Sequence, residues 1–480
     1  MVIGSIPGST VDSRQPEHTG LFTFMLLILI WAPIPIGSNR PWSMALVEIG
    51  MLMLMGFWLL TYAWRPFVLP DTIRRGRFVL VLLIAWALYP LLQLIPLPGQ
   101  VVEAVGGSFY SAYGQALGQD SGNTNSSAAF LSVDRGATLS GFLWQCSLVA
   151  AYFCVLALVT SRKRLTILLI VLFLVGFANA FYGLLIYFGG DALGLWNPGY
   201  ADGVVSGTYV NQNHFAGLMV LTIPMGLGLF LYYQGGRHWQ PRMTKVIRSL
   251  IPVVAGQSGI ILFCVLIMAA ALILTTSRGG VGALAIGIVV AVLCAVISKG
   301  RRAGELGLAV VAVTLIVIAL FWIGPGKMSD KLQNSGLTSQ RGDLRQVSYQ
   351  IIDDSPLFGT GVGTYRWVFP GYKDEKFGGN FYEHAHNDFL ELLGEQGVIG
   401  ATLLALPVLM LLFRIVRTYG RTRDPLARGV LFAAIGGSVA ILVHGLVDFN
   451  LHIPANALYF VALLGLGSVA GELGSEPRTS

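Results

Sequence analysis

RKRLTILLIVLFLVGFANAFYGLLIYF, residues 162–188, places three basic residues before 24 residues without a charge. An α-helix of about 20 apolar residues crosses the roughly 30 Å hydrocarbon core of a bilayer. Similar runs recur along most of the chain, which is 54% hydrophobic and only 11% charged. A soluble domain carries about 25% charged residues. The chain is therefore predicted to be an all-α polytopic membrane protein.

We expect about twelve transmembrane helices. Their approximate ranges are 21–37, 43–63, 77–97, 140–160, 165–188, 214–233, 256–276, 280–298, 306–325, 397–416, 428–447 and 456–473. The chain then divides into a tail at 1–20, nine helices in 21–325, a large loop with short helices at 326–396, three helices in 397–473, and a tail at 474–480. The first 20 residues lack the basic start and cleavage site of a signal peptide.

The basic residues favour one side of this arrangement. Of the 31 lysines and arginines, 21 fall in the two tails and in short alternate connections, and the other 10 are spread over longer loops. The positive-inside rule then makes both termini cytoplasmic and turns the long loops 98–139, 189–213 and 326–396 outward. The net charge of +7 is thus largely a topology signal and implies no nucleic-acid partner. The four cysteines lie in apolar runs and indicate neither disulfides nor a metal site.

A polar stretch, FYEHAHNDFLELLGEQGVIG at 381–400, leads into the tenth expected span. Asn387 or Asp388 is placed to cap a helix there, because both side chains accept hydrogen bonds from the free N–H groups of a first turn. Helical spacing predicts an inward apolar face and an exposed acidic face. The inward residues are Phe389, Leu390 and Leu393, and the exposed ones are Glu391 and Glu395.

His386 carries the most versatile chemistry of this stretch. If the hydrocarbon begins near Gly397, about ten helical residues place His386 about 15 Å higher, at the depth of a phospholipid diphosphate. Gly394, Gly397 and Gly400 are expected to let another helix pack closely. The simpler interpretation is a surface histidine beside a helix cap. The pair of His384 and His386 lacks a third metal ligand at helical spacing, so we expect no metal.

TTSRGG, residues 275–280, joins two apolar runs and is expected to form a tight hairpin at the outer surface. Arg278 lies close to the hydrocarbon there, where an inward-facing guanidinium costs roughly 3 kcal/mol. A guanidinium at this depth suits a bidentate phosphate contact. The alternative is an arginine that extends to ordinary lipid headgroups.

The largest outward loop contains SQRGDLRQVSYQIIDDSPLFGTGVGTY, residues 339–365. Its apolar spacing predicts a helix that Pro356 ends, followed by a flexible turn in GTGVG. Arg341 and Arg345 lie four residues apart on one helical face, where they form a basic patch or pair with nearby aspartates. No strand precedes the glycines and no lysine follows them, so this is not a nucleotide-binding loop.

Two further polar clusters lie at the outward ends of expected spans. GTYVNQNHFAG at 207–217 contains Asn213 and His214, and HGLVDFNLHIP at 444–454 contains Asp448. Polar residues at membrane depth are functional candidates, and loop capping is the simpler explanation for both clusters. The second cluster also holds His444, Asn450 and His452.

Together these stretches resemble the O-antigen ligase and O-antigen polymerase superfamily of bacterial glycan-assembly membrane proteins. HAHNDFLELLGEQGVIG fits the family pattern H-[N/S/Q]-x9-G-x-x-G. TTSRGG, GTYVNQNHFAG and the spacing from Arg341 to Pro356 follow the family's order along the chain. The likeness covers roughly 200–460. One difference is Arg345, which stands where the family often has a tryptophan eleven residues before the proline.

The resemblance implies an enzyme at the periplasmic face of the bacterial inner membrane that uses an undecaprenyl-diphosphate-linked glycan. The sugar passes to an acceptor hydroxyl with inversion, without a metal or other cofactor. His386 is then expected to be the catalytic base, because imidazole accepts a proton near neutral pH. Arg278 and Arg341, with Arg345 as a helper, are expected to bind the diphosphate. The expected supporting residues are Asn387, Asp448, His384, Asn213 and His214.

Two activities within this superfamily stay open. A polymerase hands the growing chain to the next lipid-linked unit, and a ligase hands the glycan to lipid A–core. PIPIGSNRPW at 33–42 resembles the polymerase branch, including exopolysaccharide assembly, in which other glycan-assembly proteins are possible partners. A transporter of lipid-linked sugars and a non-catalytic scaffold are the alternatives from other classes. Polar clusters at the outer rim and the lack of a repeat between the halves favour the enzyme over a transporter.

Overall fold

The computed structural model describes residues 18–106, 128–190, 203–234, 256–298 and 336–474. Ten helices in this part are long and apolar enough to cross a membrane, which confirms the all-α polytopic architecture. They are α2 (Pro41–Trp64), α3 (Asp71–Gln93), α6 (Arg135–Leu158), α7 (Arg162–Gly189), α8 (Gln212–Gln234), α10 (Gln257–Leu274), α11 (Arg278–Ile297), α16 (Asp388–Tyr419), α17 (Pro425–Gly445) and α18 (Pro454–Leu473). The predicted span 306–325 lies outside the described residues, so the count of twelve stays a prediction.

The first predicted span, 21–37, is helical only in part. Helix α1 (Thr19–Trp31) has 13 residues, which gives a length of about 20 Å and falls short of a bilayer. The prolines of the following PIPIGS lack the N–H groups that would continue the helix. The chain instead turns through the short 3-10 helix η1 (Ile36–Ser38).

Helices α8 and α17 form the centre of the bundle, and most of their side chains are buried. Their backbones meet at Gly228 and Gly429, where a Cβ on either residue would overlap the carbonyl oxygen of the other. Gly287 of α11 lies equally close to the carbonyl of Gly436 in α17. Membrane helices approach this closely only where the facing residues are small. The glycines therefore set the distance between the central helices.

The basic helix ends gather at one end of the bundle. Arg162, at the start of α7, lies 2.7 Å from Asp424, which caps α17. Arg75 of α3 lies 2.6 Å from Glu472 near the end of α18. Both contacts join segments that the charge pattern assigns to the same side of the membrane.

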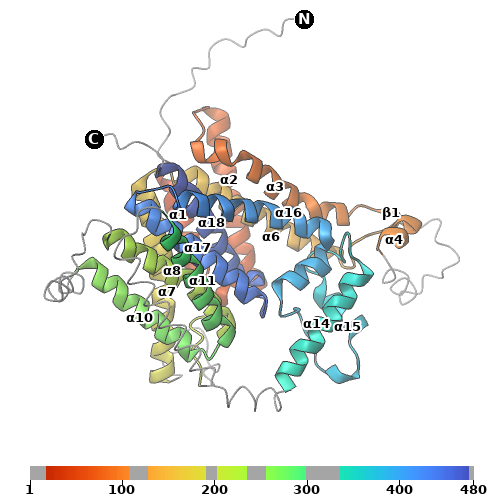
Figure 1. The fold of residues 1–480 in the computed structure, drawn as a ribbon. Coiled ribbons are helices and arrows are strands. Elements are labelled where there is room, and N and C mark those ends of the chain that lie inside the picture. The colour runs from red at the N-terminus through yellow and green to blue at the C-terminus, as the bar shows by residue number, and fades with distance from the viewer. Residues whose placement is uncertain (1–17, 107–127, 191–202, 235–255, 299–335, 475–480) are drawn as a thin grey trace, which may run out of the picture.

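The loop helices form a small second core beside the bundle (Figure 1). It consists of α14 (Gly336–Asp354), α15 (Tyr365–Tyr372) and the 3-10 helix η3 (Glu375–Phe377). Helix α14 ends two residues before Pro356, as predicted. The buried residues of this core are Leu344, Val347, Ile351, Tyr365, Val368, Phe369, Phe377 and Ala385. Three further short elements are β1 (Leu97–Pro98), which pairs antiparallel with β2 (Ala128–Ala129), and α4 (Gly99–Gly106).

Gly429→Val tests the contact between α8 and α17. The added side chain would overlap the Gly228 carbonyl, so we expect a loss of about 1–3 kcal/mol in stability. The measurement is the thermal unfolding midpoint in one detergent. Gly282→Val in α11 is the control, because no atom lies within 4 Å of its added Cβ. Equal effects of the two substitutions would contradict the close contact.

Candidate active site

His386 lies in the short segment between η3 and α16. Its backbone has a φ of 50°, a left-handed conformation that costs a non-glycine residue roughly 1–2 kcal/mol. The next side chain, Asn387, accepts hydrogen bonds from the N–H groups of Phe389 and Leu390 at 3.0 Å each, which confirms the predicted cap. Asn387 also donates to the Leu446 carbonyl at 2.9 Å. The start of α16 is thereby tied to the connection that follows α17.

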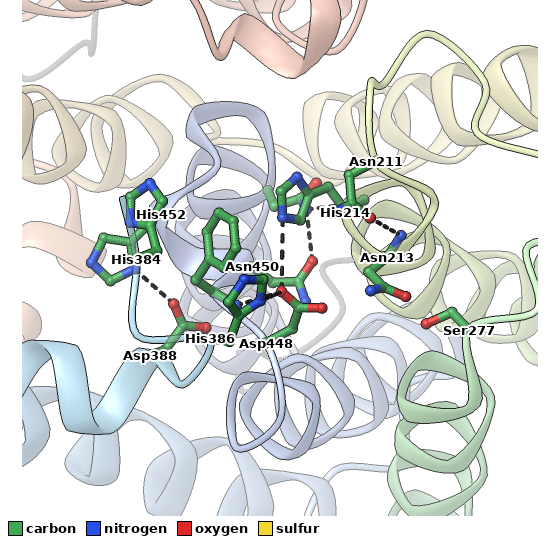
Figure 2. Close-up of polar contacts among 12 residues, drawn as sticks. Asn211, Asn213, His214, Ser277, His384, His386, Asp388, Asp448, Asn450 and His452 are labelled. Atoms are coloured by element: carbon green, nitrogen blue, oxygen red, sulfur yellow. Dashed lines mark hydrogen bonds and ion pairs between the residues drawn. The ribbon is translucent and has the colours of Figure 1, made fainter. Parts of the chain in front are cut away.

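Asp448 is the point where four segments of the chain meet, and Figure 2 shows His386 and His214 beside it. Its Oδ1 lies 3.4 Å from His386 Nδ1 and 3.8 Å from His214 Nε2. Its Oδ2 lies 3.6 Å from Arg341 Nη2. The Asp448 side chain is 2% exposed, whereas His386 and Arg341 keep 24% and 43% of their surface. The structure thus brings together four of the residues that the sequence singled out.

The surroundings keep Asp448 ionised. Burial alone would raise the pKa of this carboxyl, but contact with the His386 ring and the nearby His214 and His444 rings hold the pKa of Asp448 well below its usual range. The contact between His386 and Asp448 is electrostatic and not a hydrogen bond, because His386 Nδ1 is buried without a hydrogen-bond partner among the described residues. A carboxylate beside Nδ1 favours the proton on that nitrogen and leaves Nε2 free to accept one.

Phe449 separates His386 from a second group of polar residues. Its ring packs edge-on against His214 at 4.5 Å and His386 at 4.8 Å between centroids. It stacks on His384 at 4.2 Å. No sequence pattern singles out Phe449, because an aromatic residue at the end of a span is ordinary at a membrane interface.

The second group centres on His452, in the 3-10 helix η4 (Asn450–His452). His452 Nδ1 lies 2.9 Å from Asp388 Oδ1, and its Nε2 lies 3.4 Å from Glu391 Oε1. His384 Nδ1 lies 2.7 Å from the same Glu391 oxygen. Burial opposes a charge on His452, but the Glu391 and Asp388 carboxylates raise its pKa to about 10. His452 is therefore a cation at neutral pH and balances the carboxylates beside it.

The expectation that Glu391 faces outward is wrong. Its side chain is 1% exposed, because His384 and the Ala385 N–H, at 2.8 Å, satisfy its carboxylate. A third possible ligand comes from outside helical spacing, since His384, Glu391 and His452 each place one possible ligand atom within 4.8 Å of the others. The expectation of no metal stays a prediction. Sequence spacing concealed this group, because η4 brings His452 in from a distant part of the chain. In the structure as described, these atoms pair with one another.

Residues 263–405 match a protein-family model described as O-antigen ligase. This match supports placing the chain in the O-antigen ligase and polymerase superfamily. The matched segment includes Arg278, Arg341 and His386, whereas His214 and Asp448 lie outside it. No curated protein matches the chain. The ten long apolar helices and this match support a multi-pass membrane protein with a glycosyltransferase-like role of the O-antigen ligase type.

The glycine-rich turn of the O-antigen ligase segment is fixed by Glu395 of α16. The Glu395 carboxylate accepts the N–H groups of Gly363 and Tyr365 at 2.9 Å each. Its backbone carbonyl accepts the Gly361 N–H at 3.0 Å. Glu395 is therefore buried and not exposed as predicted, and the turn is held by hydrogen bonds where a flexible one was predicted.

Helix α16 is interrupted at Gly397, where φ is 60° and ψ is −173°. The N–H groups of Val398 and Ile399 donate to the carbonyls of Pro356 at 2.8 Å and Leu357 at 3.2 Å. A side chain at position 397 would overlap the Leu357 carbonyl, and the positive φ also favours glycine. The neighbour packed against Gly397 is therefore loop backbone and not the predicted helix. At Gly400 the predicted close packing of another helix is confirmed, because an added Cβ would overlap Tyr89 of α3. The rise of about 15 Å from Gly397 to His386 stays a prediction.

The remaining predicted residues surround this centre. Arg278 is half-buried at the first turn of α11, beside two glycines that pack against His444. Arg345 is exposed on α14, and neither arginine forms an ion pair with another described residue. Asn213 lies in the first turn of α8, and its N–H donates to the Asn211 side chain at 2.8 Å. This last contact is the capping that the simpler interpretation predicted.

The His452 ion pairs predict a loss of stability at alkaline pH. The pKa of about 10 in the folded protein lies above the ordinary 6.5, so the stabilisation is complete below about pH 6.5 and is lost as the pH approaches about 10. We expect His452→Gln to unfold at a lower temperature than wild type at neutral pH. The gap should close as the pH rises past about 10. Thermal unfolding across this range measures it, and a gap that does not change with pH would contradict the ion pairs.

Proposed function

We propose that the chain transfers a glycan from undecaprenyl diphosphate to an acceptor hydroxyl at the periplasmic face, with inversion at the anomeric carbon. The observation that carries the proposal is the shared carboxylate of Asp448, which lies 3.4 Å from His386 and 3.6 Å from Arg341. The reaction needs a base for the proton of the acceptor and a cation for the charge on the leaving diphosphate. His386 and Arg341 place such a base and such a cation next to the same carboxylate.

His386 Nε2 is the proposed base. It accepts the proton of the acceptor hydroxyl while the hydroxyl oxygen bonds to the anomeric carbon of the donor. The bond from that carbon to the diphosphate oxygen breaks, and the diphosphate keeps the electron pair. Asp448, beside Nδ1, orients the ring and stabilises the imidazolium that forms.

Arg341 and Arg278 are the cations proposed for the diphosphate. Arg341 is 43% exposed and lies 3.6 Å from Asp448, so most of its N–H groups stay available to phosphate oxygens. Arg278 begins α11, where the free N–H groups of the helix start add positive potential. Arg345, further along α14, is an optional helper. These guanidinium groups supply positive charge to the reaction without a metal ion.

Within the superfamily we favour a polymerase for O-antigen or exopolysaccharide, because the 33–42 stretch resembles that branch. A ligase that joins the glycan to lipid A–core is the alternative. Deleting the gene separates the two activities. Single capped units without long chains support the polymerase, whereas long polymer left on its lipid carrier supports the ligase.

We also propose that the protein lies in the bacterial inner membrane with both termini in the cytoplasm. The uneven distribution of basic residues supports this orientation. This orientation is supported further by two ion pairs that join basic helix ends, Arg162 with Asp424 and Arg75 with Glu472. The site around His386 then faces the periplasm, where the lipid-linked donor is presented.

His386→Ala tests the base. With purified protein, a lipid-diphosphate-linked glycan and an acceptor, we expect kcat to fall by about 10²–10⁴. Donor binding should change little, because the ring acts on the acceptor proton. Product formation on gels measures the rate, and thermal unfolding checks that the variant is folded. A folded variant with the wild-type rate would exclude His386 as the base.

Arg341→Gln and Arg345→Gln form a matched pair on one helix. Both side chains are exposed, but only Arg341 contacts Asp448. Loss of a preorganised cation from the leaving group should lower kcat by about 10²–10³ for Arg341→Gln. The Arg345 variant should stay within about threefold of wild type, as expected for an exposed charge. Equal losses would contradict the distinction between the two arginines.

A further inference from the structure

A cavity of about 300 Å³ lies at the opposite end of the bundle from His386. It opens between α3, α16 and α18. Three arginines and three hydroxyl side chains line it, with Glu472 as the acidic residue of the lining. The six are Arg75, Arg414, Arg421, Thr418, Thr422 and Ser468.

The helices place this cavity one membrane thickness from the proposed active site. Val398–Tyr419 of α16 gives a helical length of about 33 Å between the break and the cavity. Helix α18 runs from Pro454, close to His452, to Leu473 beside the cavity, which is 20 residues or about 30 Å. The hydrocarbon core of a bilayer is about 30 Å thick. The cavity therefore lies at the other membrane surface, among the basic helix ends.

The cavity carries excess positive charge. Glu472 pairs with Arg75 at 2.6 Å and with Arg414 at 3.4 Å, and Arg414 also donates to the Arg75 carbonyl at 3.4 Å. Arg421 is exposed and forms no ion pair with another residue that the structure describes. Three guanidinium groups thus face one carboxylate. Guanidinium N–H groups match phosphate oxygens in charge and geometry.

An apolar surface continues from the cavity toward the membrane interior. On α3 this surface is a stripe that consists of Phe78, which is 57% exposed, the partly exposed Leu82 and the exposed Ala85, three, seven and ten residues after Arg75. Because Arg75 lines the cavity and lies at the end of this stripe, a polar head in the cavity would have its acyl chains along it. Inorganic phosphate would use the arginines and leave the stripe uncovered.

We propose that this cavity binds the phosphate group of an anionic phospholipid in the leaflet that contacts the basic helix ends. The chemistry recognised is a phosphate ester. The source favoured by the adjoining apolar stripe is a lipid headgroup. Basic pockets between helices at the cytoplasmic surface suit such headgroups, because anionic lipids concentrate there. This site is independent of the reaction proposed at His386.

The test measures binding to the full-length protein in an uncharged detergent by titration calorimetry. The probes are dihexanoyl phosphatidylglycerol, dihexanoyl phosphatidylcholine and inorganic phosphate. We expect phosphatidylglycerol to bind at least about tenfold more tightly than the other two. Arg421→Gln should weaken phosphatidylglycerol binding about fivefold. The control is Arg417→Gln, an exposed arginine of the same helix end that does not line the cavity.

The outcomes separate the possible ligands. A larger effect of Arg421→Gln than of Arg417→Gln, together with preference for the anionic lipid, supports the proposal. Inorganic phosphate that binds as tightly as phosphatidylglycerol would assign the cavity to a soluble phosphate and overturn the lipid. Equal binding of both lipids, or equal effects of the two substitutions, would overturn the site altogether. His386→Ala should leave all three titrations unchanged, so a failure here is distinct from a failure at the active site.

Discussion

The negative charge of Asp448 must be balanced inside the protein, because its side chain is 2% exposed and an unpaired buried charge costs several kcal/mol. Arg341 supplies the positive charge, and the His214 and His386 rings lie beside the same carboxylate from two other segments. Each of these side chains is therefore held where the carboxylate needs it. Folding and the assembly of the proposed active site thus depend on the same contacts, which is why residues so far apart in sequence converge at one point.

A further pair of buried carboxylates, Asp388 and Glu391, has different partners. Asp388 and Glu391 both pair with His452, while Phe449 stands between that cluster and His386. The two histidines of HAH consequently have different roles despite their spacing: His384 belongs to the structural cluster, and His386 faces Asp448. An aromatic wall keeps the fixed cation of one cluster apart from the ring proposed to exchange protons in the other.

The sequence predicted the features that depend on local chemistry. Apolar runs located most of the helices, and the pair Asn387 and Asp388 indicated the helix start that Asn387 caps. Glu391 and Glu395 were placed on the exposed face because acidic residues on an amphipathic helix usually face water. Their partners, His452 and the N–H groups of the glycine turn, come from distant segments, which periodicity does not reveal.

The break at Gly397 has a mechanical consequence. The carbonyls of Pro356 and Leu357 accept the N–H groups of Val398 and Ile399, which the break leaves free. Main-chain hydrogen bonds therefore join the loop to α16. Rotation of the loop about this joint would strand two amides in an apolar setting, at a cost of about 1–3 kcal/mol each. The loop helices α14 and α15 therefore behave as a rigid unit that is fused to the membrane bundle and does not swing as a cover.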